Sequence, residues 1–302
     1  MEKKITANST IISMLAGMIS DKSEQAYVAA EEYVETLSTS GETYSRIKSL
    51  LRARPRKMIQ LDGLSHELKK LVQFSQVTED NVYLDEITKV LLDELFLEWD
   101  NKELFREHNL PVRNKILLHG ATGNGKTTIA RHIAKISNLP FIEVNADIII
   151  DSHVGTSGQN IFKLFNQVNE PCVLFWDEID SIGRRRGKGN DNAAAVENER
   201  MVNSILVNIE KLNNDVIFIG ATNRREVLDS AFLRRFDVQY ELPSPNIERK
   251  NAFANQMIEY YKIPTELISV NWDSMENYSE IKLSLIDIAR KYILSKIESV
   301  IK

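Results

Sequence analysis

Cysteine is nearly absent from this chain: Cys172 is the only one among 302 residues. A single cysteine excludes an internal disulfide framework and fits a reducing compartment, so we expect a cytoplasmic protein. Because Cys172 opens an apolar run, we expect it to pack as a small core residue.

Long apolar runs are missing as well. The stretch 11–19 comes nearest, but it includes Ser13 and Gly17 and is followed by Asp21 and Lys22. It is too short to span a bilayer, which takes about 20 apolar residues, and no clear signal-peptide cleavage site follows it. We therefore expect an amphipathic helix here and no membrane partner.

The chain also lacks an excess of positive charge. Its formal net charge of −5 gives no general attraction to nucleic acid. One basic cluster contains no acidic residue: Arg46, Lys48, Arg52, Arg54, Arg56 and Lys57. It could bind nucleic acid or an acidic partner, but a solvated helix face is the commoner meaning of such a cluster. Few aromatic residues interleave, which argues against single-strand binding.

The zinc-protease motif H-E-x-x-H is a further absence. The nearest segment is residues 66–70, in which Lys70 stands in place of the second histidine. We therefore expect no protease of this kind within these residues.

The composition that remains is that of a globular protein, with 43% hydrophobic and 27% charged residues. Residues 1–77 show a helical pattern, clearest over 23–37 and 42–53. Residues 78–243 alternate strands and helices, which predicts an α/β domain with a parallel sheet covered by helices on both faces. After Pro243 the pattern is helical again, so 244–302 are expected to form a small lid with helices over 247–261 and 281–300.

The most informative segment matches G-x-x-x-x-G-K-[ST], the P-loop pattern that cradles phosphates. An apolar run over 115–119 precedes it and a helical pattern follows, as this motif requires. The glycines allow a tight turn, the lysine can reach the β- and γ-phosphates, and the first threonine hydroxyl can ligate Mg²⁺. The predicted nucleotide-binding residues are Gly120, Ala121, Thr122, Gly123, Asn124, Gly125, Lys126, Thr127 and Thr128.

A second motif extends nucleotide binding to hydrolysis. The apolar run 172–176 predicts a buried parallel strand, and Asp177 and Glu178 follow at its carboxyl end. Ligands of α/β sheets bind at that end. Asp177 is expected to hold Mg²⁺, and Glu178 is expected to act as the general base toward the attacking water.

A third strand, predicted over 215–221, ends in Thr222 and Asn223. Asn223 could hydrogen-bond the γ-phosphate or the attacking water. Further along, Arg234 and Arg235 stand side by side in Leu-Arg-Arg-Phe-Asp. Two solvated surface charges are the simplest interpretation of this pair, but its distance from the third strand favours a functional role.

Together these motifs resemble the AAA ATPases over roughly residues 78–302. Lys126 with Thr127 is similar to the Walker A motif, Asp177 with Glu178 to Walker B, and Asn223 to sensor 1. The resemblance implies ATP and Mg²⁺ as cofactors. It also implies that Arg234 and Arg235 are arginine fingers reaching a neighbouring subunit, and hence a homo-oligomeric ring, usually a hexamer.

Two departures from the family pattern matter. The family usually carries Leu-x-Arg-x-Gly-Arg-Phe-Asp, whereas this chain lacks the intervening pair; we favour Arg235 as the principal finger because it keeps the Arg-Phe-Asp context. The first pore loop of the family usually reads aromatic-hydrophobic-glycine, whereas here it reads His153, Val154 and Gly155. Histidine grips apolar side chains less well, so processive threading of a polypeptide is less expected.

The resemblance predicts a ring-forming ATPase that remodels a protein partner. An alternative is an ATPase subunit that activates or feeds a separately encoded protease or nuclease, for example in bacterial defence. An alternative of another class is an ATP-dependent switch or scaffold with incidental turnover. We expect residues 1–77 to select the substrate or adaptor or to support assembly.

Overall fold

The computed structural model describes residues 30, 33, 71–75, 81–146, 157–168, 170–183 and 202–301. The chain forms two compact units, residues 1–60 with 135–139 and residues 61–134 with 140–302. Nearly all described residues belong to the second unit. Ala30 and Tyr33 are helical; apart from these two, the predicted amino-terminal helices and the basic cluster lie outside the described residues.

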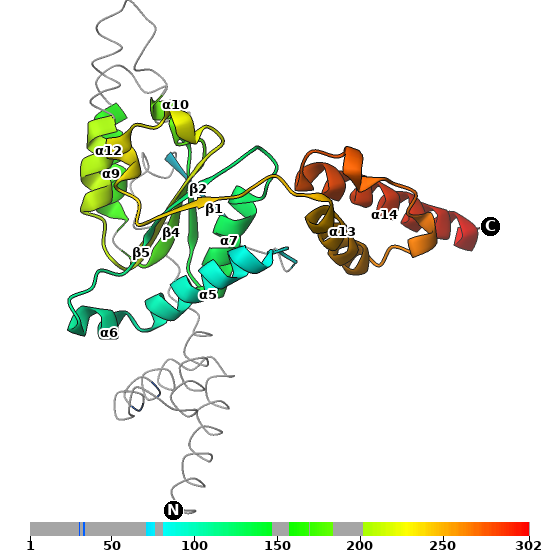
Figure 1. The fold of residues 1–302 in the computed structure, drawn as a ribbon, viewed down its shortest axis with the longest axis horizontal. Helices are drawn as coiled ribbons and strands as arrows, with labels where there is room; N and C mark the ends of the chain where they lie inside the picture. The colour runs from blue at the N-terminus through cyan, green and yellow to red at the C-terminus, as the bar shows by residue number, and fades with distance from the viewer. Residues whose placement is uncertain are drawn as a thin grey trace, which may run out of the picture. The chain divides into compact units, whose positions relative to one another are not determined.

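The second unit is built on a six-stranded sheet with the strand order β1-β3-β4-β5-β2-β6 (Figure 1). All neighbouring strands pair in parallel except β1, which is antiparallel to β3. This confirms the predicted α/β class with a P-loop type of sheet. The strands are β1 (Val72–Ser75), β2 (Lys115–His119), β3 (Phe141–Val144), β4 (Cys172–Trp176), β5 (Val216–Thr222) and β6 (Val238–Glu241).

Strands β4 and β5 form the centre of the core, because every residue in both is buried. Continuous apolar runs of this kind predict strands covered on both faces. Trp176 pairs with Gly220, and His119 of β2 pairs with Thr222. The carboxyl ends of β2, β4 and β5 therefore meet at one edge of the sheet, where each is followed by a predicted site segment.

Strand β1 lies within residues 1–77, which we predicted to be helical. Val72 pairs with Val144, and Ser75 pairs with Phe141. A strand of 4 residues carries little periodic signal of its own. The open edge of β3 supplies its hydrogen-bonding partners, and this tertiary context is not visible in the local sequence.

Helices surround the sheet; in Figure 1, α5 and α7 lie to one side of it and α9 and α12 to the other. Residues 202–210 are also helical. Asp85 caps α5 by accepting from the backbone N–H of Thr88 at 2.8 Å. The helices of this part are α5 (Glu86–Asp100), α6 (Lys102–Glu107), α7 (Lys126–Ile136), α9 (Ser157–Gln167), α10 (Asp180–Gly183), η3 (Arg225–Val227) and α12 (Ser230–Leu233).

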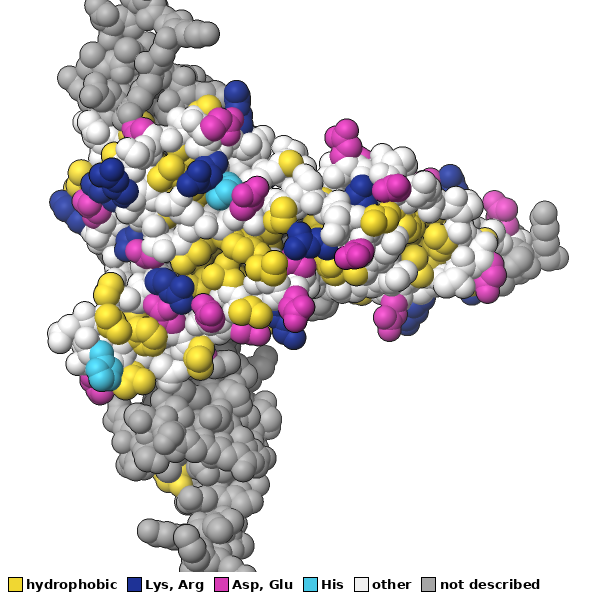
Figure 2. Space-filling view, viewed as in Figure 1, with side chains coloured by type: hydrophobic (Ala, Val, Ile, Leu, Met, Phe, Trp, Pro, Cys, Tyr) yellow, Lys and Arg dark blue, Asp and Glu magenta, His cyan; other side chains and the backbone are white. Residues whose placement is uncertain are grey.

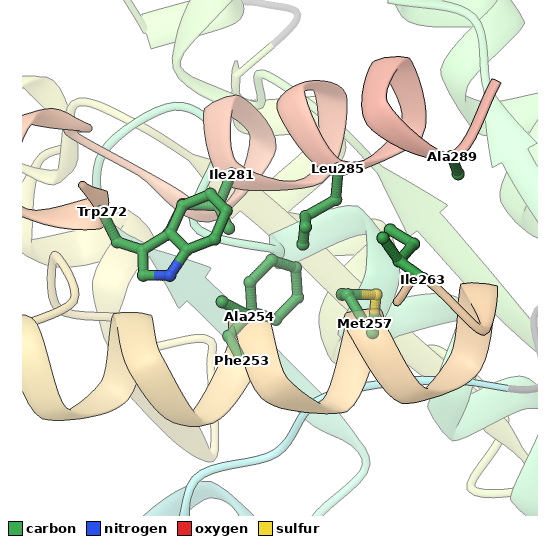
Figure 3. Close-up of a cluster of buried hydrophobic side chains, with 8 residues drawn as sticks. All are labelled: Phe253, Ala254, Met257, Ile263, Trp272, Ile281, Leu285 and Ala289. Atoms are coloured by element: carbon green, nitrogen blue, oxygen red, sulfur yellow. The ribbon is translucent and has the colours of Figure 1, made fainter. Parts of the chain in front are cut away.

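After Pro243 the chain is helical, as predicted. The elements are α13 (Ile247–Tyr261), η4 (Thr265–Leu267), η5 (Trp272–Ser274) and α14 (Tyr278–Ile301). Side chains at helical spacing on α13 and α14 face one another and bury a small core with Trp272 and Ile263 (Figure 3). These two helices therefore share a hydrophobic core of their own, which contains Phe253, Ala254, Met257, Ile281, Leu285 and Ala289.

The surface of the sheet-containing part carries hydrophobic side chains over α5 and α6, visible in yellow in Figure 2. The exposed hydrophobic residues of these two helices are Ile87, Val90, Leu97 and Leu104. No helix in the described part of the chain is both long enough and apolar enough to cross a membrane.

Candidate nucleotide site

The loop between β2 and α7 takes backbone conformations that favour glycine. Gly120, Gly123 and Gly125 have φ values of 142°, 82° and 92°. A β-carbon on Gly120 would lie 2.3 Å from the carbonyl oxygen of Leu242, and one on Gly123 would lie 2.6 Å from Oδ1 of Asn277. Glycine is therefore required at both positions. The loop leads directly into the N-terminus of α7, whose first N–H groups have no partner within the helix.

Lys126, the first residue of α7, turns its ammonium back over this loop. Its Nζ donates to the carbonyl oxygen of Gly120 at 2.8 Å and to that of Ala121 at 3.0 Å. Burial lowers the pKa of Lys126, and the nearby carboxylates of Asp177 and Asp180 oppose that shift. The ammonium is therefore partly desolvated and held by neutral oxygens, a setting in which phosphate oxygens would stabilise its charged form.

Thr127 and Asp177 lie side by side at the ends of α7 and β4. The Thr127 hydroxyl donates to Oδ2 of Asp177 at 3.1 Å. A hydroxyl and a carboxylate are oxygen donors that suit Mg²⁺, which is usually bound by one or two protein groups together with substrate phosphates and water. Within the described residues, no group of three His, Cys, Asp or Glu gathers around a common point. Thr127 and Asp177 therefore fit a magnesium ion shared with a phosphate ligand.

Glu178 is fixed by its backbone. Its N–H donates to Oδ1 of Asp177 at 2.9 Å, and its φ is 48°. This left-handed conformation costs a residue other than glycine on the order of 1–2 kcal/mol. Such strain persists only where the surroundings enforce it, and it is concentrated at functional sites.

Asn223 directly follows β5 and reaches the phosphate loop. Its Nδ2 donates to the Thr122 hydroxyl at 3.2 Å. The tip of β5 is therefore tied to the loop that follows β2, as expected for neighbouring parallel strands.

These segments converge on one cavity of about 280 Å³. The structure thus brings together most of the side chains that the sequence predicted, and it adds Ser279 from α14. The lining residues are Thr122, Gly123, Gly125, Lys126, Thr127, Thr128, Asp177, Glu178, Asn223 and Ser279. Gly120 and Ala121 do not line the cavity, but their carbonyl oxygens accept hydrogen bonds from Lys126.

The two arginines do not line this cavity. Arg234 follows α12 and is exposed. Arg235 is partly buried, and its Nε lies 2.8 Å from Oε1 of Glu210. The pore-loop residues His153, Val154 and Gly155 lie outside the described residues.

A second cavity, of about 90 Å³, adjoins the phosphate loop and was not predicted from the sequence. Asn124 lines it and donates from Nδ2 to the carbonyl oxygen of Leu242 at 3.1 Å. The cavity shares Gly123, Gly125, Thr128 and Ser279 with the first one. Its other lining residues include Asn81, Tyr83, Asp85, Thr88, Ile129, Pro243, Phe253, Met257, Tyr278 and Lys282.

Aromatic rings form much of this second cavity. The rings of Tyr83 and Tyr278 are 5.6 Å apart, and that of Phe253 is 4.9 Å from Tyr278. Burial raises the pKa of both tyrosines. Asp85 holds the segment before α5 in place, with Oδ2 3.2 Å from Arg249 of α13. The phosphate-loop residues of this cavity belong to a local motif, whereas its aromatic rings meet only through tertiary packing.

The parallel sheet, the glycine loop before α7 and the acidic pair after β4 define a P-loop nucleotide-binding protein. Residues 116–244 match the family model of the ATPase family associated with various cellular activities (AAA). That range contains the Asp177–Glu178 pair, Asn223 and both arginines. Residues 116–244 therefore form an AAA ATPase domain.

Curated relatives named ATP-dependent zinc metalloprotease FtsH match over the same part. The protein of Pelodictyon phaeoclathratiforme is 38% identical over 158 residues, covering 50% of this chain and 24% of the relative. The protein of Parabacteroides distasonis is 36% identical over 160 residues, which cover 51% of this chain and 23% of the relative. The protein of Caulobacter vibrioides is 40% identical over 141 residues, which cover 43% of this chain and 22% of the relative. The chain thus spans about a quarter of the length of these relatives.

Proposed function

We propose that this protein hydrolyses ATP at the site formed by the ends of β2, β4 and β5, and that two neighbouring copies complete each site. The observation that carries the proposal is the convergence of Lys126, Thr127, Asp177, Glu178 and Asn223 on one cavity. A phosphate loop alone would support binding. A carboxylate side chain beside the loop supports hydrolysis as well.

Lys126 binds the β- and γ-phosphates in this proposal. Its ammonium exchanges two loop carbonyl oxygens for charged phosphate oxygens, which form stronger hydrogen bonds with it. The N–H groups at the start of α7 add favourable electrostatics toward the same anion.

Glu178 accepts a proton from the attacking water, and Asn223 orients that water or the γ-phosphate. A positioned general base contributes about 10²–10⁴-fold to a rate. Thr127 and Asp177 would hold Mg²⁺, which neutralises charge on the phosphates when bound. Most of the acceleration in such a site comes from placing these groups before reaction begins.

The second cavity accepts the nucleoside. It adjoins the phosphate loop through Gly123 and Gly125 and is lined by aromatic rings from the segment before α5 and from α13 and α14. An aromatic and apolar cavity suits a purine base, because both present flat, poorly hydrated faces. Since α14 also contributes Ser279 to the phosphate cavity, nucleotide contacts would link 244–302 to 78–243, the two domains that we propose.

Arg234 and Arg235 serve the site of a neighbouring copy. Neither lines its own cavity, and a finger acting in trans implies a ring, for which we propose a hexamer. Arg235 must leave Glu210 to do so. A partly exposed ion pair is worth about 0–1 kcal/mol, whereas a finger contributes about 10³–10⁵-fold in rate. We keep Arg235 as the principal finger, because breaking this pair is small by comparison.

The work performed is remodelling of a protein partner in the cytoplasm. The relatives are named ATP-dependent zinc metalloproteases, which favours a link to proteolysis. These 302 residues contain no H-E-x-x-H sequence. The name of these relatives also favours, as a second candidate, an ATPase that activates or feeds a separately encoded protease or nuclease.

Two substitutions test the proposed chemistry. Lys126→Ala should lose nucleotide binding, because the phosphates lose their main cation. Glu178→Gln should bind ATP as the wild type does, yet hydrolyse it about 100-fold or more slowly. Binding is measured with a fluorescent ATP analogue, and turnover is measured by phosphate release. Near-normal turnover of Glu178→Gln would remove Glu178 from its role as base.

A further inference from the structure

Behind the site, a buried hydrogen bond joins the segment after β4 to the tip of β5. The Thr222 hydroxyl donates to Oδ1 of Asp180 at 2.7 Å. Thr222 is 0% exposed and Asp180 is 3% exposed. Neither residue lines the phosphate cavity. Their side chains therefore do not touch a nucleotide there, although each stands within two residues of a side chain that does.

The same hydroxyl also fixes the residue after Asn223. The backbone N–H of Arg224 donates to Oγ1 of Thr222 at 2.9 Å. Asn223 is thus held between two anchored neighbours. Because a hydroxyl can donate and accept at once, Thr222 connects Asp180 to both sides of Asn223.

On the other side, Glu178 is held by the same two segments. The N–H of Ile179 donates to the carbonyl oxygen of Ala221 at 3.0 Å, and the N–H of Ser181 donates to that of Glu178 at 2.8 Å. Asp180 lies between these two contacts. A carboxylate anchored there holds the chain against β5 two residues after Glu178, whose φ is 48°.

We propose that the Asp180–Thr222 hydrogen bond positions Glu178 and Asn223 relative to each other for hydrolysis. This inference rests on the proposed function. A buried charged acceptor makes the bond strong and directional, so the two segments move as one body. Phosphate binding uses the loop over 120–128. That loop meets Thr222 through the backbone, where the Gly120 N–H donates to the Thr222 carbonyl oxygen at 3.2 Å, and a change of the Thr222 side chain keeps this contact. Loss of the bond should therefore slow the chemical step and leave ATP affinity unchanged.

Thr222→Val is the primary variant, because valine keeps the shape of threonine and removes the hydroxyl. We expect kcat to fall about 10- to 100-fold, the scale of a misplacement of about 1 Å, with the Kd for a fluorescent ATP analogue within about twofold of the wild type. Thr222→Ser keeps the hydroxyl and should retain at least about half of the wild-type kcat. If Thr222→Val does not fold, Thr222→Ala removes the same hydroxyl, keeps the Asp180 carboxylate and should show the same separation of kcat from Kd.

Asn114→Ala is the matched control at the opposite end of β5. Asn114 is 1% exposed, and its Nδ2 donates to the carbonyl oxygen of Val216 at 2.8 Å. Its loss should lower the melting temperature without a tenfold loss of kcat. An active wild type with an equally active Thr222→Val variant would overturn this inference alone. A wild type without ATP hydrolysis would overturn the proposed function and this inference with it.

Discussion

At the scale of single residues, the surroundings of the phosphate loop change the pKa of its neighbour His119. It ends β2 directly before Gly120. Burial lowers its pKa, and the positive charge of Arg225 acts in the same direction. The nearby carboxylate of Glu241 opposes the shift. Folding therefore favours the neutral form of the His119 imidazole over the protonated form.

The dependence of the free energy of unfolding on pH tests whether the pKa of His119 is lowered in the folded state. The folded-state pKa of His119 lies below its unfolded value of about 6.5, so the unfolded chain binds more protons just below that pH. The free energy of unfolding should then fall as pH decreases through about 6.5. His119→Gln should lose less stability than the wild type between pH 7.5 and 5.5 in urea unfolding. Equal losses in the two proteins would contradict the assignment.

The residues of the phosphate site were predictable because each motif is local. A glycine loop and a carboxylate pair at a strand end carry their chemistry in consecutive residues, and the structure places them around one cavity. The nucleoside cavity was not predictable in this way. Tyr83, Phe253 and Tyr278 are far apart in the sequence, and only packing brings their rings within contact.

At the scale of elements, the clearest sequence patterns predicted the ends of helices and strands most accurately. The apolar run of β4 and the amphipathic pattern of α13 predicted elements that begin and end at the observed residues. Helix α14 begins earlier than predicted, at Tyr278. Strand β1 was missed because β3, rather than its own sequence, determines its conformation.

Strand β5 offers an element-scale prediction. A β-carbon on Gly220 would lie 3.1 Å from Cζ of Phe236 and 3.2 Å from Cδ1 of Ile179. These residues adjoin Arg235 and Glu178. Gly220→Ala should push both neighbours outward by a few tenths of an ångström and reduce kcat several-fold, a modest share of the roughly 100-fold cost of a 1 Å displacement. Phosphate release at saturating ATP measures this.

Gly158→Ala is the control for that substitution. A β-carbon on Gly158 would meet nothing within 4 Å, and alanine is the better helix former, by about 0.5–1 kcal/mol. This variant, in α9, should keep its turnover and melt at or above the wild-type temperature. If Gly220→Ala matches Gly158→Ala in both measurements, the packing of β5 does not position the site.

At the scale of the whole molecule, the central claim is that neighbouring copies share each ATP site. The sequence predicted this through resemblance to a family, because no local pattern encodes a contact between copies. Within one copy, the phosphate cavity contains the lysine, the carboxylates and Asn223, but neither Arg234 nor Arg235. An assembly that brings these arginines to another copy would complete the set.

A mixed assembly tests that claim most directly. Lys126→Ala and Arg235→Ala chains are co-expressed with different tags, and assemblies carrying both tags are purified. Each variant alone should be inactive, because one lacks its own lysine and the other lacks the arginine for its neighbour, a loss of about 10³–10⁵-fold. In the mixture, an intact Lys126 site can face an intact Arg235, so phosphate release should return. Arg234→Ala is tested in the same way.

The control mixture combines Lys126→Ala chains with Glu178→Gln chains. Each of these substitutions damages the nucleotide site of the chain that carries it. Every site in that mixture lacks one essential group, so it should stay inactive. The account predicts activity in the first mixture and none in the control. Normal turnover by both single arginine variants, or a first mixture no more active than the control, would contradict it.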